Sequence, residues 1–328
     1  MKRSAFSFPR RRACLALAAC VLASPWAVAQ DNGRPLRLVV AGPAGGSADL
    51  VARLVAEPLA RELGRPVIVD PKPGAAGAIA VGELLQAPPD GNTLLVGVNS
   101  LVSEIPHIVK LRWDMGKVLR PVAELARGGL VLVAHPSLPA STVPELVAYA
   151  KAHPGKLSYA SYSPGTMSHV LGVILNRAAG IDLLHVGYKG STPALADVMG
   201  GHVPLMFDGV ATSLPLVRGG KLKVLAVSTP QRLPQLPQVP TFHEIGYPQM
   251  DAVGWMGLWS APGLPAAVQE RVRAAALKVL GQAGLRAQLL ETGFEAGQPR
   301  SVEALAQELR TDYERVGAVL KSVGFRPE

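Results

Sequence analysis

Cysteine is almost absent from this sequence of 328 residues. Both cysteines, Cys14 and Cys20, lie within the first 20 residues, so the rest of the chain has no thiol. This excludes a disulfide framework, a cysteine nucleophile and a cysteine-ligated metal site from most of the protein. Its stability must come from a hydrophobic core, which a chain of about 300 residues can build as one large domain or as two lobes.

A hydrophobic run long enough to anchor the chain in a membrane is also lacking at the N-terminus. The run from Ala13 to Trp26 is shorter than the roughly 20 residues that span a bilayer. Basic residues precede it and Ala27-Val28-Ala29 closes it, which is the pattern of a secretory signal over residues 1–29. The sequence therefore predicts a periplasmic protein.

The export route stays open. Arg11-Arg12 resembles a twin-arginine signal, as an alternative to the general secretory route. Leu17-Ala18-Ala19-Cys20 resembles a lipoprotein cleavage box, which would leave a lipid anchor at Cys20.

Positive charge is sparse beyond this segment. The whole chain has a net charge of +9. Residues 1–29 contain five basic residues and no acidic ones, and no Lys/Arg run follows residue 30. Aromatic residues make up 5% of the chain and are not interleaved with basic ones, so a nucleic-acid partner is excluded. The weakly positive remainder suits an anionic ligand.

The familiar catalytic patterns are missing as well. The sequence has no Gly-x-Ser-x-Gly elbow and no His-Glu-x-x-His helix, and its seven histidines are not at metal-ligand spacing. Ser168 and His169 are neighbours on an expected helix, so their side chains diverge. We therefore expect a protein that is not an enzyme and that uses no metal and no cofactor.

Short β-branched runs alternate with longer helical patterns, which predicts an α/β fold with a mostly parallel sheet. The expected strands are 36–41, 67–70, 93–98, 130–134, 157–161, 183–186, 205–208, 223–228 and 254–260. The expected helices are 48–63, 75–86, 143–153, 166–179, 192–199, 265–280 and 302–323.

The number of strands favours two lobes over one. The runs Leu130–Ala134 and Gly254–Ser260 are continuously apolar, and a proline follows each of them, so we expect the chain to cross between lobes there. Lobe 1 then comprises residues 30–129 and 254–328, and lobe 2 comprises residues 130–253. A cleft between lobes is a common place for a small-molecule site.

Two glycine-bearing turns are the best candidates for that site. Gly42–Asp49 and Ser161–His169 each lie between an expected strand and an expected helix. Glycine lets a ligand approach the backbone, and the unpaired N–H groups at a helix start attract an anion. If the lobes face each other, the two helix starts converge on one anion.

For each turn the plain alternative is an ordinary strand-to-helix connection or helix cap. The carboxylate of Asp49 would repel an anion, so it either turns back onto backbone N–H groups or meets an ammonium group of the ligand. The turns at Pro73–Gly77, Tyr188–Thr192 and Phe207–Gly209 either line the cleft or serve only as loops.

The ordered motifs of the chain resemble a known family. They are Pro43-Ala44-Gly45-Gly46 with Asp49 and Arg53, Pro73–Gly77, Pro89-Asp90-Gly91, His153–Leu157, Gly165-Thr166 with His169, His185-Val186 with Tyr188-Lys189-Gly190, and Val239-Pro240-Thr241 with Glu244 and Gly246. The sequence is similar to the Bug family, the TctC-like extracytoplasmic receptors of tripartite tricarboxylate transporters. That resemblance implies a two-lobed type II periplasmic-binding-protein fold that closes on a carboxylate ligand.

The resemblance also implies which residues bind the ligand and which partners the protein has. The expected ligand-binding residues are Ala44, Gly45, Gly46, Ser47, Asp49, Ser163, Gly165, Thr166, His169, Tyr188 and Asp208. The protein is expected to be a monomer that delivers its ligand to membrane permease subunits. The alternatives are a ligand-sensing partner of a signalling system and a periplasmic hydrolase or lyase.

Three positions depart from the family pattern. Gly42 replaces a frequent aromatic residue, Glu104 adds a negative charge close to the expected site, and Val118-Leu119 replace a customary Asp-Phe. These departures leave the identity of the ligand open.

Overall fold

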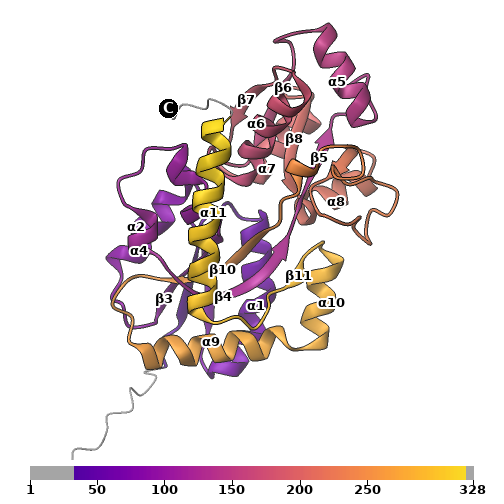
Figure 1. Cartoon of the computed structure of the whole chain (residues 1–328). Coiled ribbons are helices and arrows are strands. Elements are labelled where there is room, and N and C mark those ends of the chain that lie inside the picture. The colour runs from indigo at the N-terminus through magenta and orange to yellow at the C-terminus, as the bar shows by residue number, and fades with distance from the viewer. Residues whose placement is uncertain (1–32, 323–328) are drawn as a thin grey trace, which may run out of the picture. The chain divides into compact units, whose positions relative to one another are not determined.

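Two β-sheets, each covered by helices on both faces, organise residues 33–322, which are the residues that the computed structural model describes (Figure 1). From Pro35 onward the chain forms one compact unit. The expected signal segment, with Cys20 and the twin-arginine pair, lies outside the described residues.

The first sheet and its helices form lobe 1. Its strands are β1 (Leu36–Val40), β2 (Val67–Pro71), β3 (Thr93–Val98), β4 (Arg120–Gly128), β10 (Gly254–Ser260) and β11 (Glu295–Ala296), in the order β11-β4-β10-β3-β1-β2. Its helices are α1 (Ser47–Leu63), α2 (Ala78–Gln86), α3 (Ser100–Ser103), α4 (Met115–Val118), α9 (Ala266–Leu280), α10 (Ala283–Glu291) and α11 (Val302–Ser322), with short 3₁₀ turns at Ala75–Gly77 and Ile105–His107.

The second sheet and its helices form lobe 2. Its strands are β5 (Leu130–Ala134), β6 (Ser158–Ser161), β7 (Leu184–Gly187), β8 (Leu205–Gly209) and β9 (Lys223–Val227), in the order β7-β6-β8-β5-β9. Its helices are α5 (Val143–Ala152), α6 (Met167–Ala179), α7 (Ser191–Met199) and α8 (Val210–Arg218), with a 3₁₀ turn at Pro248–Met250.

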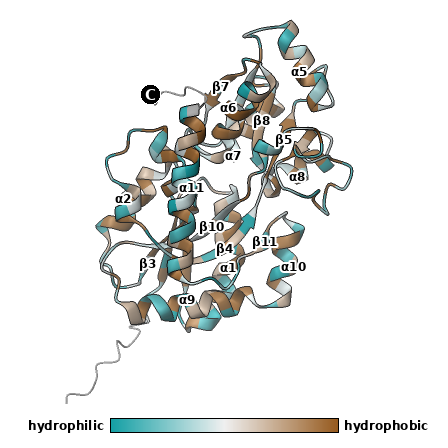
Figure 2. Ribbon diagram, viewed as in Figure 1, coloured by the Kyte–Doolittle hydropathy of each residue, from teal (hydrophilic) through white to brown (hydrophobic). Residues whose placement is uncertain are grey.

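Continuously apolar strands are explained by cores on both faces of each sheet. Leu38 and Val40 pack into one core of lobe 1, whereas Val39 between them packs into the other. In lobe 2, Leu132 and Val133 divide in the same way. The long helices α9 and α11 carry both hydrophobic and hydrophilic residues along their length (Figure 2). A strand buried on both faces has no polar side to show, so its apolar run is unbroken.

The α/β class is confirmed, but the expectation of mostly parallel sheets is wrong. In lobe 1, β1 pairs in parallel with β2 and β3, whereas β10 runs antiparallel to β3 and β4. In lobe 2, β5 runs antiparallel to β8 and β9. Strands β5 and β10 enter from the other lobe without a helical crossover inside their own sheet, so they are not bound to the parallel direction.

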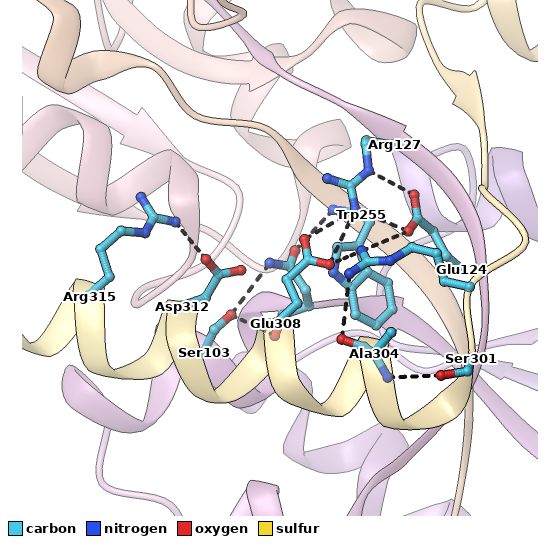
Figure 3. Close-up of polar contacts among 11 residues, drawn as sticks. Ser103, Glu124, Arg127, Trp255, Ser301, Ala304, Glu308, Asp312 and Arg315 are labelled. Atoms are coloured by element: carbon cyan, nitrogen blue, oxygen red, sulfur yellow. Dashed lines mark hydrogen bonds and ion pairs between the residues drawn. The ribbon is translucent and has the colours of Figure 1, made fainter.

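Each expected strand and helix overlaps an observed one, and the first turn of the helix expected over 75–86 is the 3₁₀ turn that precedes α2. Several elements were not foreseen. Strand β4 was missed because it carries Glu124 and Arg127. Figure 3 shows Arg127 bonded both to Glu124 and to Glu308 of α11, and its guanidinium lies 2.8 Å from Glu124 and 3.1 Å from Glu308. The buried carboxylate of Glu124 is thus paired. Helix α8 was missed because Pro215 lies inside it.

The described chain passes between the two sheets at two places, from β4 to β5 and from β9 to β10. Ser228 holds these crossings together. Its hydroxyl accepts a hydrogen bond from the Leu130 N–H (2.8 Å) and donates one to the Ala252 carbonyl (2.8 Å). A Cβ on Gly129 would lie 2.6 Å from the Thr229 side chain, so the strands cross at backbone distance.

We predict that Ser228→Ala lowers the free energy of unfolding by about 1–3 kcal/mol, because the buried Leu130 N–H loses its side-chain acceptor. Urea denaturation measures the loss. Ser260→Ala is the matched control, since Ser260 is also buried but its hydroxyl has no hydrogen-bond partner among the described residues. Equal losses in the two variants would contradict this role for Ser228.

Candidate functional site

A cavity of about 600 Å³ lies between the two sheets and is lined by residues of both lobes. Its walls are the loops that follow β1, β2 and β3 in lobe 1 and β6, β7 and β8 in lobe 2, together with the start of β10 and the crossing at Gly128–Leu130. Ligands of open α/β sheets bind beyond the carboxyl ends of the strands, and the cavity occupies that place in both sheets at once.

Five helices begin at the cavity wall, and their first N–H groups receive no side-chain cap. Glycine caps four of them: Gly46 for α1, Gly77 for α2, Gly190 for α7 and Gly209 for α8. Thr166 caps α6, but its hydroxyl donates to the Ser163 carbonyl (2.7 Å). Each helix start adds roughly half a positive charge, so the cavity attracts an anion.

Helices that begin elsewhere start differently. In α5, the Thr142 hydroxyl accepts a hydrogen bond from the Glu145 N–H (3.3 Å). Helices α9 and α10 begin after Pro265 and Gln282. Among the described helices of eight or more residues whose caps are defined, glycine therefore caps only those that open on the cavity.

The loop after β1 contributes Gly46 and Ser47 to the cavity wall, but not Ala44, Gly45 or Asp49. Asp49 is 1% exposed, and its carboxylate accepts a hydrogen bond from the Gly45 N–H (2.8 Å) and pairs with Arg53 (2.8 Å). It thus shapes the loop from behind the wall.

The loop after β6 contributes Ser163, Thr166 and His169. Gly165 is not part of the wall, and its N–H donates to Nδ1 of His169 (3.2 Å). This bond requires the His169 tautomer in which Nε2 carries the proton. Gly165 also needs its φ of +83°, and a Cβ there would lie 3.0 Å from Ile105 of lobe 1.

His169 stacks on His185, with ring centroids 3.6 Å apart and an angle of 7° between the rings. Burial lowers the pKa of His169 to about 3 and that of His185 to about 4, so both rings are neutral at neutral pH. His185 also lines the cavity and contacts the Ser161 hydroxyl at 2.7 Å. His185 belongs to one of the family motifs, but nothing in the sequence around it identifies it as a site residue.

Tyr188 lines the cavity, whereas Asp208 does not. The Tyr188 hydroxyl donates to Asp197 (2.6 Å), and burial followed by this bond raises its pKa to about 12. Asp208 is fully buried, accepts hydrogen bonds from Thr212 (2.5 Å) and Ser213 (2.7 Å) of α8, and has a pKa raised by burial. Its carboxyl group therefore stabilises the first turns of α8 and does not face the cavity.

Of the three departures from the family pattern, Gly42 lines the cavity and Val118 packs on the core of lobe 1. Glu104 is 5% exposed and lies behind the wall, hydrogen-bonded to the Ser103 hydroxyl. Burial raises the pKa of Glu104 to about 7, and the charge of Asp312 adds a smaller rise.

Lys189 is the only lysine or arginine among the described residues that line the cavity. Within residues 33–322 no group of three or more His, Cys, Asp or Glu side chains could hold a metal ion. No helix in that range is both long and apolar enough to cross a membrane.

A family model described as the tripartite tricarboxylate transporter family receptor, TctC, matches residues 51–325. The chain belongs to this family. A relative of the UPF0065 group from Bordetella pertussis is 31% identical and covers 98% of this chain and 99% of its own length. The protein BugT of the same organism is 32% identical, over 75% of this chain and 76% of its own. The resemblance to Bug and TctC-like receptors is thus confirmed.

Solved structures confirm the two-lobed fold of this TctC receptor. An R. palustris protein with adipate has a TM-score of 0.86 and 29% identity, covering 90% of this chain and 99% of its own. MatC from Rhodopseudomonas palustris with bound malate has a TM-score of 0.82 and 30% identity, covering 88% and 99%.

Glu104 gives the receptor a testable pH dependence. Its pKa is raised in the folded state, so the folded state increasingly disfavours its ionised form as the pH rises from about 4.5 to about 7. Glu104→Gln should match the parent at about pH 4 and exceed its stability at about pH 8 by roughly 3 kcal/mol, at about 1.4 kcal/mol per pKa unit. Urea denaturation at both pH values measures this.

Exposed Glu57→Gln serves as the control, and should keep the pH profile of the parent. Three groups act on Glu104 or respond to it: Asp312 and Arg315 of α11, and Tyr162 of lobe 2. These groups are unchanged in both variants. Parallel profiles for Glu104→Gln and the parent would show that Glu104 does not titrate in this range.

Proposed function

We propose that this protein is a periplasmic receptor that binds a small carboxylate and presents it to the permease of a tripartite tricarboxylate transporter. One observation carries the proposal: helix starts of both lobes, without side-chain caps, open on one cavity. Membership of the TctC family supports the transporter, and the adipate and malate complexes of its structural relatives support the ligand class.

The proposed anion site lies between the start of α1 and the start of α6. The backbone N–H group of Ser47 binds the carboxylate from lobe 1, and those of Ser163 and Met167 bind it from lobe 2. The N–H groups of Gly46 and Thr166 already donate to the carbonyls of Pro43 (3.1 Å) and Ser163 (3.4 Å) and shape the two turns. Lys189 adds a positive charge from the rim. The other expected residues that do not line the cavity hold its loops in shape without contacting the ligand; they are Ala44, Gly45, Asp49, Gly165 and Asp208.

We also propose that residues 30–129 with 254–328 and residues 130–253 move as two lobes about the crossings at Gly129 and Ser228. Close approach across the cavity supports this. A Cβ on Gly190 would lie 2.2 Å from Pro43, and one on Gly209 would lie 2.6 Å from the Ser47 hydroxyl. The Thr192 hydroxyl donates to the Ala44 carbonyl (3.3 Å). These contacts belong to a closed arrangement.

The proposal includes export by a signal over residues 1–29 and a monomeric receptor without catalytic activity. The family consists of receptors, which supports this. The Ser161 hydroxyl lies 2.7 Å from Nε2 of His185, but Ser161 is fully buried and does not line the cavity.

Ligand-induced stabilisation tests the carboxylate site. A carboxylate present at 100 times its dissociation constant should stabilise the protein by about 2.7 kcal/mol, and the neutral amide of the same acid should not. A thermal-shift panel of acid and amide pairs measures the difference. Equal shifts from the two members of each pair would refute the anion site.

Gly209→Val tests closure in the same panel. Gly209 is a suitable site because its φ of −66° suits any residue, so the added side chain meets Ser47 only when the lobes close. The variant should lose the acid-induced shift while the unliganded protein keeps its melting temperature. Gly284→Ala, where a Cβ meets nothing within 4 Å, should keep the shift.

A further inference from the structure

One wall of the cavity is apolar and rigid. It is built by Leu101, Ile105, Ile108 and Val109, which follow β3, together with Trp255 and Met256 of β10. Leu101 fills the space left by two glycines: a Cβ on Gly77 or on Gly97 would lie 2.4 or 2.6 Å from its methyl groups. Stacking on Trp259, at 5.0 Å between ring centroids, holds Trp255 in place.

Helices from both lobes cover this wall. Ile108 packs in one cluster with Val170 of α6 and Val316 of α11. From lobe 2, Met167 reaches the wall beside β10, where a Cβ on Gly254 would lie 2.7 Å from its terminal methyl group. A ligand group on this wall is therefore removed from water.

Polar groups at this wall are poorly suited to a second carboxylate. The side-chain oxygen of Asn99 accepts from the backbone N–H of Trp255 (3.1 Å), and its amide nitrogen donates to Ser103 (3.4 Å). The buried indole N–H of Trp255 has no hydrogen-bond partner among the described residues, but it is a single neutral donor and cannot balance the charge of a carboxylate. Glu104 lies behind the apolar wall, and its acidic side chain would not attract a second carboxylate. The single cationic side chain of the cavity wall, Lys189, belongs to the loop after β7 in the other lobe. Burying an unpaired carboxylate there would cost several kcal/mol.

We propose that the ligand is a monocarboxylate with an apolar body, such as an aromatic or aliphatic acid, rather than a dicarboxylate or a hydroxylated acid. The inference rests on the proposed function, because it assigns the single carboxylate to the helix starts. The apolar body then lies on the wall of Leu101, Ile105, Val109 and Trp255.

Three probes separate the possibilities: 4-phenylbutyrate, adipate and 4-phenylbutyramide, measured by isothermal titration calorimetry on the protein without residues 1–29. We expect 4-phenylbutyrate to bind on the order of tenfold tighter than adipate, since only adipate must bury a second charge. The amide should not bind measurably.

Val109→Thr tests the wall without changing its shape. It should weaken 4-phenylbutyrate about three- to tenfold, through lost apolar contact, and leave adipate unchanged. Val102→Thr is the matched control, since Val102 is half-buried in the same segment but does not line the cavity. The control should bind 4-phenylbutyrate as the parent does.

The outcomes distinguish the two proposals. Adipate binding as tightly as 4-phenylbutyrate, or binding alone, overturns the inference and leaves the carboxylate receptor standing. An amide that binds as well as its acid overturns the receptor proposal. Failure of 4-phenylbutyrate to bind, or equal losses in Val109→Thr and Val102→Thr, also overturns the inference.

Discussion

Unpaired backbone N–H groups at helix starts are the constraint on which the site depends. A helix start must find acceptors for its first N–H groups, and side chains usually provide them. Around this cavity, glycine caps α1, α2, α7 and α8 and provides none. The missing acceptors define what the cavity attracts: a group rich in oxygen and negative charge.

The acidic side chains close to the cavity do not themselves accept hydrogen bonds from the first N–H groups of the helices that begin there. Asp49 turns back to Gly45 and pairs with Arg53, while Asp208 is held by the hydroxyls of α8. Glu104 lies behind an apolar wall, with a pKa raised by burial to about 7. Each carboxyl group supports a loop or a helix and stays out of the wall, so the positive field of the helix starts remains available.

Much of the fold was open to prediction from sequence, because strands buried on both faces and helices with one apolar stripe leave clear patterns. Gly46, Ser47 and Thr166 were predicted as site residues for a similar reason, since a turn between a strand and a helix is a local feature, and all three line the cavity. The direction of β10 and the existence of β4 could not be predicted from the sequence, because they depend on contacts between segments distant in sequence. Glu124 is compatible with a buried strand because Arg127 and Arg300 pair with its carboxylate.

The direction in which a side chain points could not be predicted from the sequence either, and this made part of the predicted site inaccurate. Asp49 and Asp208 occupy the expected positions in the chain, yet their carboxyl groups point into local hydrogen bonds. The apolar wall after β3 was not foreseen, because its lining role arises only when α6 and α11 cover it. His185 becomes part of the site by stacking on His169, a contact between β7 and the first turn of α6.

Nuclear magnetic resonance of the backbone amides tests the central claim most directly. During titration of the ¹⁵N-labelled protein with a carboxylate that binds, the amide protons of Ser47 and Met167 should shift downfield together, with one common dissociation constant. The Glu145 amide, already bonded to Thr142, should not move. Shifts at only one of the two loops, or at neither, would contradict a single anion held by both lobes.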